Sequence, residues 1–206
     1  MDILDNPRIW QFSRKILDKI FGLYSVRLET IAKHKLITKN NSVLDIGCGT
    51  GHYSAIPASK YLGVDLNNKY IEYAKSRYGS QNKTFRCVDA TTIGKENNNF
   101  DIVLIVDFIH HLSDKDAIHL LSKVKNMANK YLINFEPLRE ESPHIIDRFL
   151  MSLDRGKYIR TLPQLKIVYK KSGLQIYRII KISMGIFKSY LIITKPVKHV
   201  NNLERE

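Results

Sequence analysis

The sequence predicts an α/β fold built on a doubly wound sheet, in which parallel strands alternate with helices. Short apolar runs recur along the chain, and segments with helical spacing separate most of them. The runs span 42–46, 61–65, 84–88, 100–106 and 130–135. Two further runs, 174–182 and 186–194, alternate apolar and polar residues around Met184 and Gly185, so they predict a closing antiparallel hairpin.

The helices are predicted from apolar spacing and from residues that begin or end helices. Residues 7–34 predict one or two amphipathic helices that start near Pro7. Ser113 and Asp116 form a capping-box pattern at the start of another helix. The remaining helices are expected at about 52–59, at 68–78, at about 143–153 and from Pro163 to Ser172, and 91–99 is expected to be a loop.

Length and composition predict a single domain over residues 1–206. A 44% hydrophobic content is ordinary for a globular protein. Cys48 and Cys87 lie far apart without a C-x-x-C pattern, which favours a reducing compartment over a zinc site or an iron–sulfur cluster. No leader pattern or long apolar run is present in the sequence, so we expect a cytoplasmic protein.

The most informative segment is 43–51, where an apolar run leads into Asp45 and then into Gly47, Gly49 and Gly51. Alternate glycines allow positive φ angles and let a ligand lie directly on the main chain. His52 occupies the place of the last glycine in the dinucleotide pattern G-x-G-x-x-G, so this is not that spacing. The form Asp-x-Gly-x-Gly-x-Gly resembles motif I of the class I S-adenosylmethionine (SAM) dependent methyltransferases.

Three further strand ends extend the resemblance. Asp65 follows Asp45 by 20 residues, the position where doubly wound folds place a ribose-binding carboxylate. The resemblance implies that Asp89 and Ala90 read the adenine and that Asp107 lies at the methionine end of SAM. Taken alone, each acid could simply form or cap a turn. The implied cofactor-binding set, with S-adenosylhomocysteine (SAH) as product, is Asp45, Gly47, Cys48, Gly49, Gly51, Asp65, Leu66, Asp89, Ala90 and Asp107.

The family also implies the rest of the fold. Class I methyltransferases have a Rossmann-like, seven-stranded sheet of five parallel strands plus a C-terminal antiparallel hairpin. We therefore expect an N-terminal helical lid over 1–40, a SAM-binding half over 41–137, and acceptor-side helices with the hairpin over 138–206. The lid candidates are Trp10, Tyr24, Glu136, Arg155 and Tyr158, although aromatic residues at helical spacing are more often core.

The predicted acceptor is a small molecule that is methylated on an O, N or C atom. The chain lacks the Pro-Pro-aromatic tetrad of nucleobase amino methyltransferases, the Pro-Cys pair of cytosine-C5 enzymes and the magnesium ligands of catechol enzymes, so no metal is implied. Residues 108–112 resemble a His-His-Leu stretch of bacterial small-molecule methyltransferases, a type 11-like branch. There His110 or His111 would act as a general base. The alternative is that one histidine caps a helix while the other packs against the sheet.

The net charge of +13 raises two other functions. Residues 41–159 carry 15 basic and 14 acidic side chains, so the excess lies at the two ends. An RNA methyltransferase would use these basic ends, but lysines are common along the whole chain, so a nucleic-acid partner is not favoured. A SAM-binding protein without turnover is the other alternative, because binding and transfer use different residues. The sequence leaves the oligomeric state open.

Overall fold

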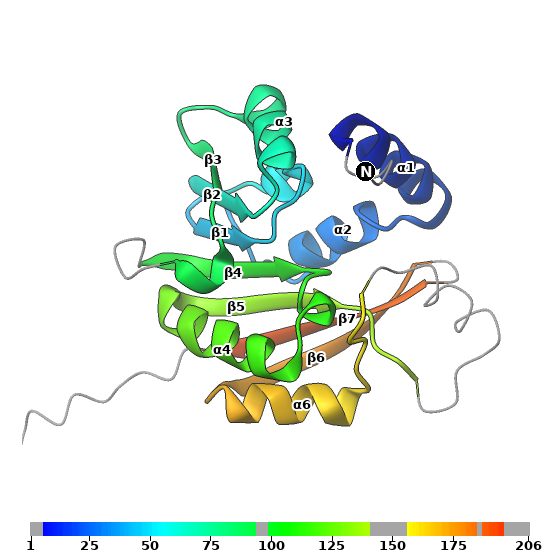
Figure 1. Cartoon of the computed structure of the whole chain (residues 1–206), viewed down its shortest axis with the longest axis vertical. Helices are drawn as coiled ribbons and strands as arrows, with labels where there is room; N and C mark the ends of the chain where they lie inside the picture. Colours follow the sequence, from blue (N-terminus) through cyan, green and yellow to red (C-terminus); the bar gives the residue numbers. More distant parts are fainter. Residues whose placement is uncertain (1–5, 94–98, 141–155, 185–186, 196–206) are drawn as a thin grey trace, which may run out of the picture.

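A computed structural model describes residues 6–93, 99–140, 156–184 and 187–195. Seven strands form one sheet in the order β3-β2-β1-β4-β5-β7-β6 (Figure 1). β1 to β5 pair in parallel, and β7 runs antiparallel to both β5 and β6. The strands are β1 Ser42–Ile46, β2 Lys60–Asp65, β3 Lys83–Cys87, β4 Phe100–Val106, β5 Ala128–Glu136, β6 Gln175–Met184 and β7 Phe187–Lys195. The predicted fold class is confirmed.

The helices follow the predicted start and stop signals. Asn6 caps α1 with Pro7 in the first turn, and Gly22 ends that helix with φ 68°. Thr161 and Gln164 form a capping box at the start of α6. The α-helices are α1 Pro7–Phe21, α2 Ser25–Lys33, α3 Asn68–Tyr78, α4 Asp114–Val124 and α6 Leu162–Lys171. The expected helix at about 143–153 lies within 141–155, outside the described residues.

Single turns of 3-10 helix follow β1, β3 and β4, and a fourth lies between α4 and β5. They are η2 His52–Ala55, η3 Ala90–Thr92, η5 Ile109–His111 and η6 Lys125–Met127. The predicted helix over 52–59 was therefore wrong beyond its first turn. Pro57 disfavours helical backbone at the residue before it, and Ile56 accordingly adopts φ −59° and ψ 139°.

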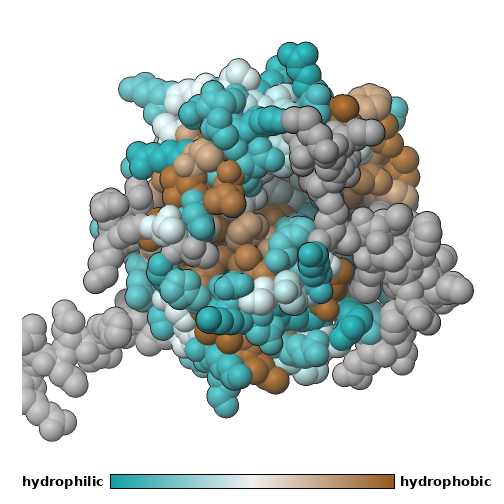
Figure 2. All heavy atoms as spheres, in the orientation of Figure 1, coloured by the Kyte–Doolittle hydropathy of each residue, from teal (hydrophilic) through white to brown (hydrophobic). Residues whose placement is uncertain are grey.

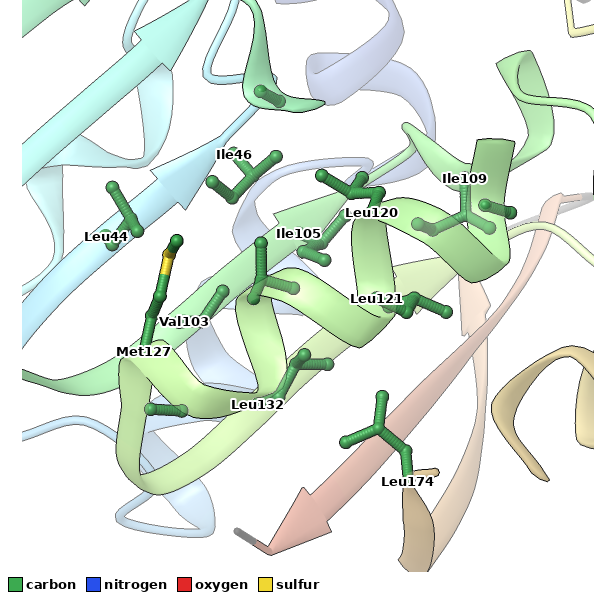
Figure 3. Packing of buried hydrophobic residues seen from close by; sticks show 14 of the residues in the cluster. Leu44, Ile46, Val103, Ile105, Ile109, Leu120, Leu121, Met127, Leu132 and Leu174 are labelled. Carbon is green, nitrogen blue, oxygen red and sulfur yellow. The ribbon is translucent and has the colours of Figure 1, made fainter. Parts of the chain in front are cut away.

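The sheet separates two apolar clusters. One contains Val103 and Ile105 of β4 together with the buried faces of α4 and α6. Figure 3 shows the part of this cluster in which Leu120 and Leu121 of α4 lie over β4. The other contains Ile102 and Leu104 of the same strand and residues of α2 and α3. Neighbouring residues of β4 thus point to opposite, covered faces, which is why this strand is a continuous apolar run.

The strand order reverses between β1 and β4, the neighbouring strands at the centre of the sheet. Ile46 pairs with Ile105, so the glycine turn after β1 and Asp107 after β4 leave the sheet side by side. In open α/β sheets, ligands bind at this reversal, beyond the carboxyl ends of the strands. The fold therefore brings the predicted cofactor residues to the expected place.

Candidate active site

The glycine turn is fixed to the neighbouring strand by its own backbone. The N–H groups of Gly47 and Cys48 both donate to the carbonyl oxygen of Val64, at 2.8 and 3.0 Å. All three glycines have positive φ, with values of 70° at Gly47, 53° at Gly49 and 79° at Gly51. Residues with a Cβ atom rarely adopt positive φ, so the backbone of this turn explains why glycine stands at these three positions.

The three glycines differ in what surrounds them. A Cβ added at Gly47 would lie 2.5 Å from the Phe108 ring, and one at Gly51 would lie 2.8 Å from the Phe85 ring. At Gly49 a Cβ would meet no described atom within 4 Å beyond its chain neighbours. Gly47 and Gly51 are therefore required by protein packing, whereas Gly49 faces open space where a ligand can approach the main chain.

Asp65 is bound to the same turn. Its Oδ2 accepts a hydrogen bond from the N–H of Gly49 at 2.9 Å, and its Oδ1 accepts from the N–H of Asn67 at 2.8 Å. Each carboxylate oxygen can accept a second hydrogen bond. The half-buried Asp65 thus connects the turn to the end of β2 and keeps acceptor capacity for a hydroxyl group.

Asp45 lies beneath the turn and is 1% exposed. It accepts a hydrogen bond from the Tyr61 hydroxyl. Burial raises the pKa of Asp45 to about 7; nearby Asp65 also raises it, and the bond from Tyr61 opposes the shift. Asp45 was predicted as a cofactor residue, and the structure places it where it supports the turn from inside the protein.

The remaining predicted cofactor residues lie around the turn. Leu66 is 70% exposed directly after β2. Asp89 is exposed and precedes η3, where Ala90 is buried. The side chain of Cys48 is 7% exposed and packs against Gly63, so only its backbone belongs to the turn. Leu66 and Asp89 are thus the exposed members of this set, at the ends of β2 and β3.

Asp107 forms an ion pair that was not predicted. Its two carboxylate oxygens accept from the Arg27 guanidinium at 2.6 and 2.8 Å, and its φ is 49°. Burial acts to raise the pKa of Asp107, but the adjacent Arg27 holds it below its usual value. Arg27 is 4% exposed and comes from α2, so the pair links the N-terminal helices to the end of β4. The sequence feature that could have indicated this pair is Arg27 itself, which stands at a position of the helical pattern where an apolar residue is expected.

Three aromatic rings gather beside this ion pair. The rings of Tyr24 and His52 stack with centroids 3.7 Å apart, and Tyr53 meets Tyr24 edge-on at 5.6 Å. The Tyr53 hydroxyl lies 3.3 Å from the Arg27 guanidinium. Burial lowers the pKa of His52. We call Tyr24, His52 and Tyr53 the aromatic group; it places the lid candidate Tyr24 next to the glycine turn.

The two predicted catalytic histidines do not extend β4 but lie in η5. His110 is 3% exposed, and its Nδ1 lies 2.6 Å from Oε2 of Glu136. The other carboxylate oxygen of Glu136 accepts from the N–H groups of Phe108 and Ile109, at 3.1 and 2.7 Å. His111 is exposed, and its ring centroid is 4.3 Å from that of His110. Glu136, predicted in the lid, is instead buried at the end of β5, where it holds this turn.

The other lid candidates are placed differently. Tyr158 is 43% exposed, and its N–H donates to the carbonyl oxygen of His110 at 2.9 Å. Trp10 belongs to α1, and Arg155 lies outside the described residues. Arg160, which sequence reasoning missed, is buried and donates to the carbonyl oxygens of Ile109 and Leu112. The segment that leads into α6 is therefore attached to η5 through Tyr158 and Arg160.

Within the described part of the chain, no three His, Cys, Asp or Glu side chains gather in a way that could hold a metal ion. Among those same residues, no helix is both long and apolar enough to span a membrane.

The central part of the chain is similar to known methyltransferases. Residues 43–130 match the model of a methyltransferase domain. The ubiquinone biosynthesis O-methyltransferase of Coxiella burnetii is 32% identical over 108 residues, which cover 50% of this chain and 44% of that protein. The match thus spans less than half the length of this relative.

Solved structures share the fold over most of the chain. A SAM-dependent methyltransferase from Aquifex aeolicus has a TM-score of 0.65 at 18% identity and covers 87% of this chain and 92% of its own. The magnesium protoporphyrin IX methyltransferase of Synechocystis, solved with bound SAH, has a TM-score of 0.62 at 18% identity, with coverages of 95% and 88%. The chain thus shares the fold of these SAM-dependent methyltransferases, and its residues 43–130 are similar to a methyltransferase domain.

Proposed function

We propose that this protein transfers a methyl group from SAM to an O, N or C atom of a small-molecule acceptor and releases SAH. The observation that carries the proposal is the open space above Gly49, in a turn whose other glycines are packed against aromatic rings. A glycine whose Cβ position faces open space fits a ligand that lies on the main chain. Asp65, bound to the same turn, would accept from the ribose hydroxyls.

Other residues would hold the remaining parts of the cofactor. Leu66 offers an exposed apolar side chain for the adenine ring, and Asp89 with Ala90 would read its edge. The backbone at Asp107 would line the methionine end, in a conformation that the Arg27 ion pair holds. When bound, SAM supplies a methyl group on a positively charged sulfur. The protein's task is then to hold the acceptor against that methyl.

The aromatic group is the proposed acceptor side. Tyr24 and His52 stack next to Gly51, and Tyr53 contacts Arg27 beside Asp107. Such rings suit a flat or apolar small molecule. Holding nucleophile and methyl in a reactive geometry can supply about 7 to 11 kcal/mol of the barrier reduction. A hydroxyl is the first acceptor group to test, because the Coxiella relative is named as an O-methyltransferase.

A hydroxyl acceptor must lose its proton, and η5 supplies the candidate bases. We assign the base role to His111, which is exposed, and a positioning role to His110, which Glu136 fixes inside the protein. Glu136 also binds two backbone N–H groups of the same turn. Its loss would therefore displace both histidines without removing either ring.

Calorimetry with SAM and SAH tests the cofactor site. Asp65→Ala should weaken binding by about 1.5 to 3 kcal/mol, because a hydrogen bond to a charged group is lost. Asp101→Ala is the matched control: Asp101 also accepts from a backbone N–H, that of Ser42, but at the other end of the sheet. Equal SAM affinity in Asp65→Ala and the unaltered protein would refute the assignment.

Transfer of radiolabelled methyl groups tests the reaction. Labelling of a hydroxylated aromatic compound supports the proposal. Labelling of total RNA instead would make the protein an RNA methyltransferase. SAM binding without transfer to any extracted small molecule would favour a binding protein over an enzyme.

A further inference from the structure

One side of α1 carries a row of exposed apolar side chains. The exposed fractions are 42% at Ile9, 67% at Phe12, 44% at Ile16 and 63% at Ile20. Steps of three and four residues place them along one side of a helix. Figure 2 shows apolar surface at the upper right, where Figure 1 places α1. We call these four residues the α1 row.

The opposite side of α1 attaches the helix to the protein. Leu17 and Phe21 pack against the cluster that contains α2 and α3. The Gln11 amide lies 3.4 Å from the Tyr78 hydroxyl at the end of α3. Asp18 accepts from the N–H groups of the residues that begin α2, at 2.7 and 3.0 Å. The α1 row is thus a second apolar surface that the packing of the described residues does not use.

Positive charge runs along one edge of the α1 row. Arg8, Lys15 and Lys19 are exposed and are spaced by seven and four residues, so they form a line beside the row. The one acid of α1, Asp18, lies on the attached side and is engaged there. Within α1 itself, an apolar row with a basic edge selects a partner that is both apolar and anionic.

We propose that α1 docks on an anionic membrane surface. The α1 row would enter the boundary between headgroups and acyl chains, while Arg8, Lys15 and Lys19 face the lipid phosphates. Helices with an apolar face and Lys or Arg on the polar side lie in this way in the plane of a membrane interface. A second copy of the chain suits the surface less well, since each copy has the same basic edge and a net charge of +13.

Vesicle co-sedimentation of the full chain tests the proposal. At about 0.1 M salt we expect binding to phosphatidylcholine vesicles that contain roughly 30% phosphatidylglycerol, and weaker binding to phosphatidylcholine alone. Phe12→Ser combined with Ile20→Ser should lower the vesicle affinity by about tenfold or more. Lys15→Gln and Lys19→Gln should each lower it about fivefold.

The control removes two exposed apolar side chains elsewhere. Ile167 in α6 and Tyr177 in β6 are 54% and 59% exposed, so Ile167→Ser with Tyr177→Ser removes similar side chains outside the α1 row. This control should keep full vesicle binding, and all variants should keep the unaltered melting temperature. The proposal is overturned if anionic vesicles are not bound or if the control loses as much affinity. It is equally overturned if sedimentation shows a dimer that Phe12→Ser with Ile20→Ser separates, because the row would then be a contact between copies.

Discussion

Replacing Gly49 by alanine separates two reasons for a glycine in this turn, which are the positive φ angle and the space for a ligand. Gly49 has φ 53°, and a Cβ there would meet no described atom within 4 Å beyond its chain neighbours. The cost to folding is therefore the left-handed backbone alone, about 1 to 2 kcal/mol. For a domain of this size, that corresponds to a fall in melting temperature of about 2 to 8 °C. SAM affinity, measured by calorimetry below the melting temperature of the variant, should fall by about tenfold or more, because the alanine side chain fills space that the ligand would occupy.

Two further glycine variants make the result interpretable. Gly173 has φ 70° at the end of α6, where an added Cβ would meet only the movable end of Lys125. Gly173→Ala should therefore lose similar stability but keep SAM affinity. Gly47→Ala should lose about 1 to 3 kcal/mol more than Gly49→Ala, because its Cβ would lie 2.5 Å from the Phe108 ring. If Gly49→Ala binds SAM as tightly as Gly173→Ala, the ligand does not lie on this turn.

Three other perturbations follow from the site. Burial raises the pKa of Asp45 from 3.8 in the unfolded chain to about 7, so the folded state holds this proton more tightly. The free energy of unfolding should therefore fall as pH rises between these two values. In urea unfolding curves, Asp45→Asn should remove that decrease. Arg27→Met should cost about 3 kcal/mol in the same assay, since Asp107 loses its cation while its side chain is 24% exposed. With a hydroxyl acceptor, His111→Ala should lower kcat by about 10²- to 10⁴-fold at unchanged SAM affinity, whereas His110→Ala should mainly lower stability.

A different result would contradict each of these three predictions. An Asp45→Asn protein with the pH dependence of the unaltered chain would mean that the carboxyl is ionised when buried. Arg27→Met combined with Asp107→Asn should recover part of the lost stability, and no recovery would show that the two side chains act separately. Full turnover of both histidine variants from about pH 6 to 9 would leave positioning as the whole of catalysis.

The sequence by itself determined the parts of this protein that depend on local chemistry. Apolar runs of strand length, caps such as Ser113 and the alternating glycines act within a few residues, so their pattern can be recognised without knowledge of the fold. The spacing from Asp45 to Asp65 also predicted that Asp65 lies near the glycine turn, because a short connection between neighbouring parallel strands brings the end of the second strand beside the end of the first.

Only the tertiary structure decided which side chains meet across the sheet. Arg27 and Asp107 are 80 residues apart, and His110 and Glu136 are 26 apart, yet each pair is held within hydrogen-bond distance by strand order and helix packing. Burial likewise depends on what covers a residue, which is why Asp45 lies inside the protein and Leu66 outside. The α1 row illustrates the same limit: its apolar spacing predicts an amphipathic helix, but the packing of Leu17 and Phe21 decided which face turned inward.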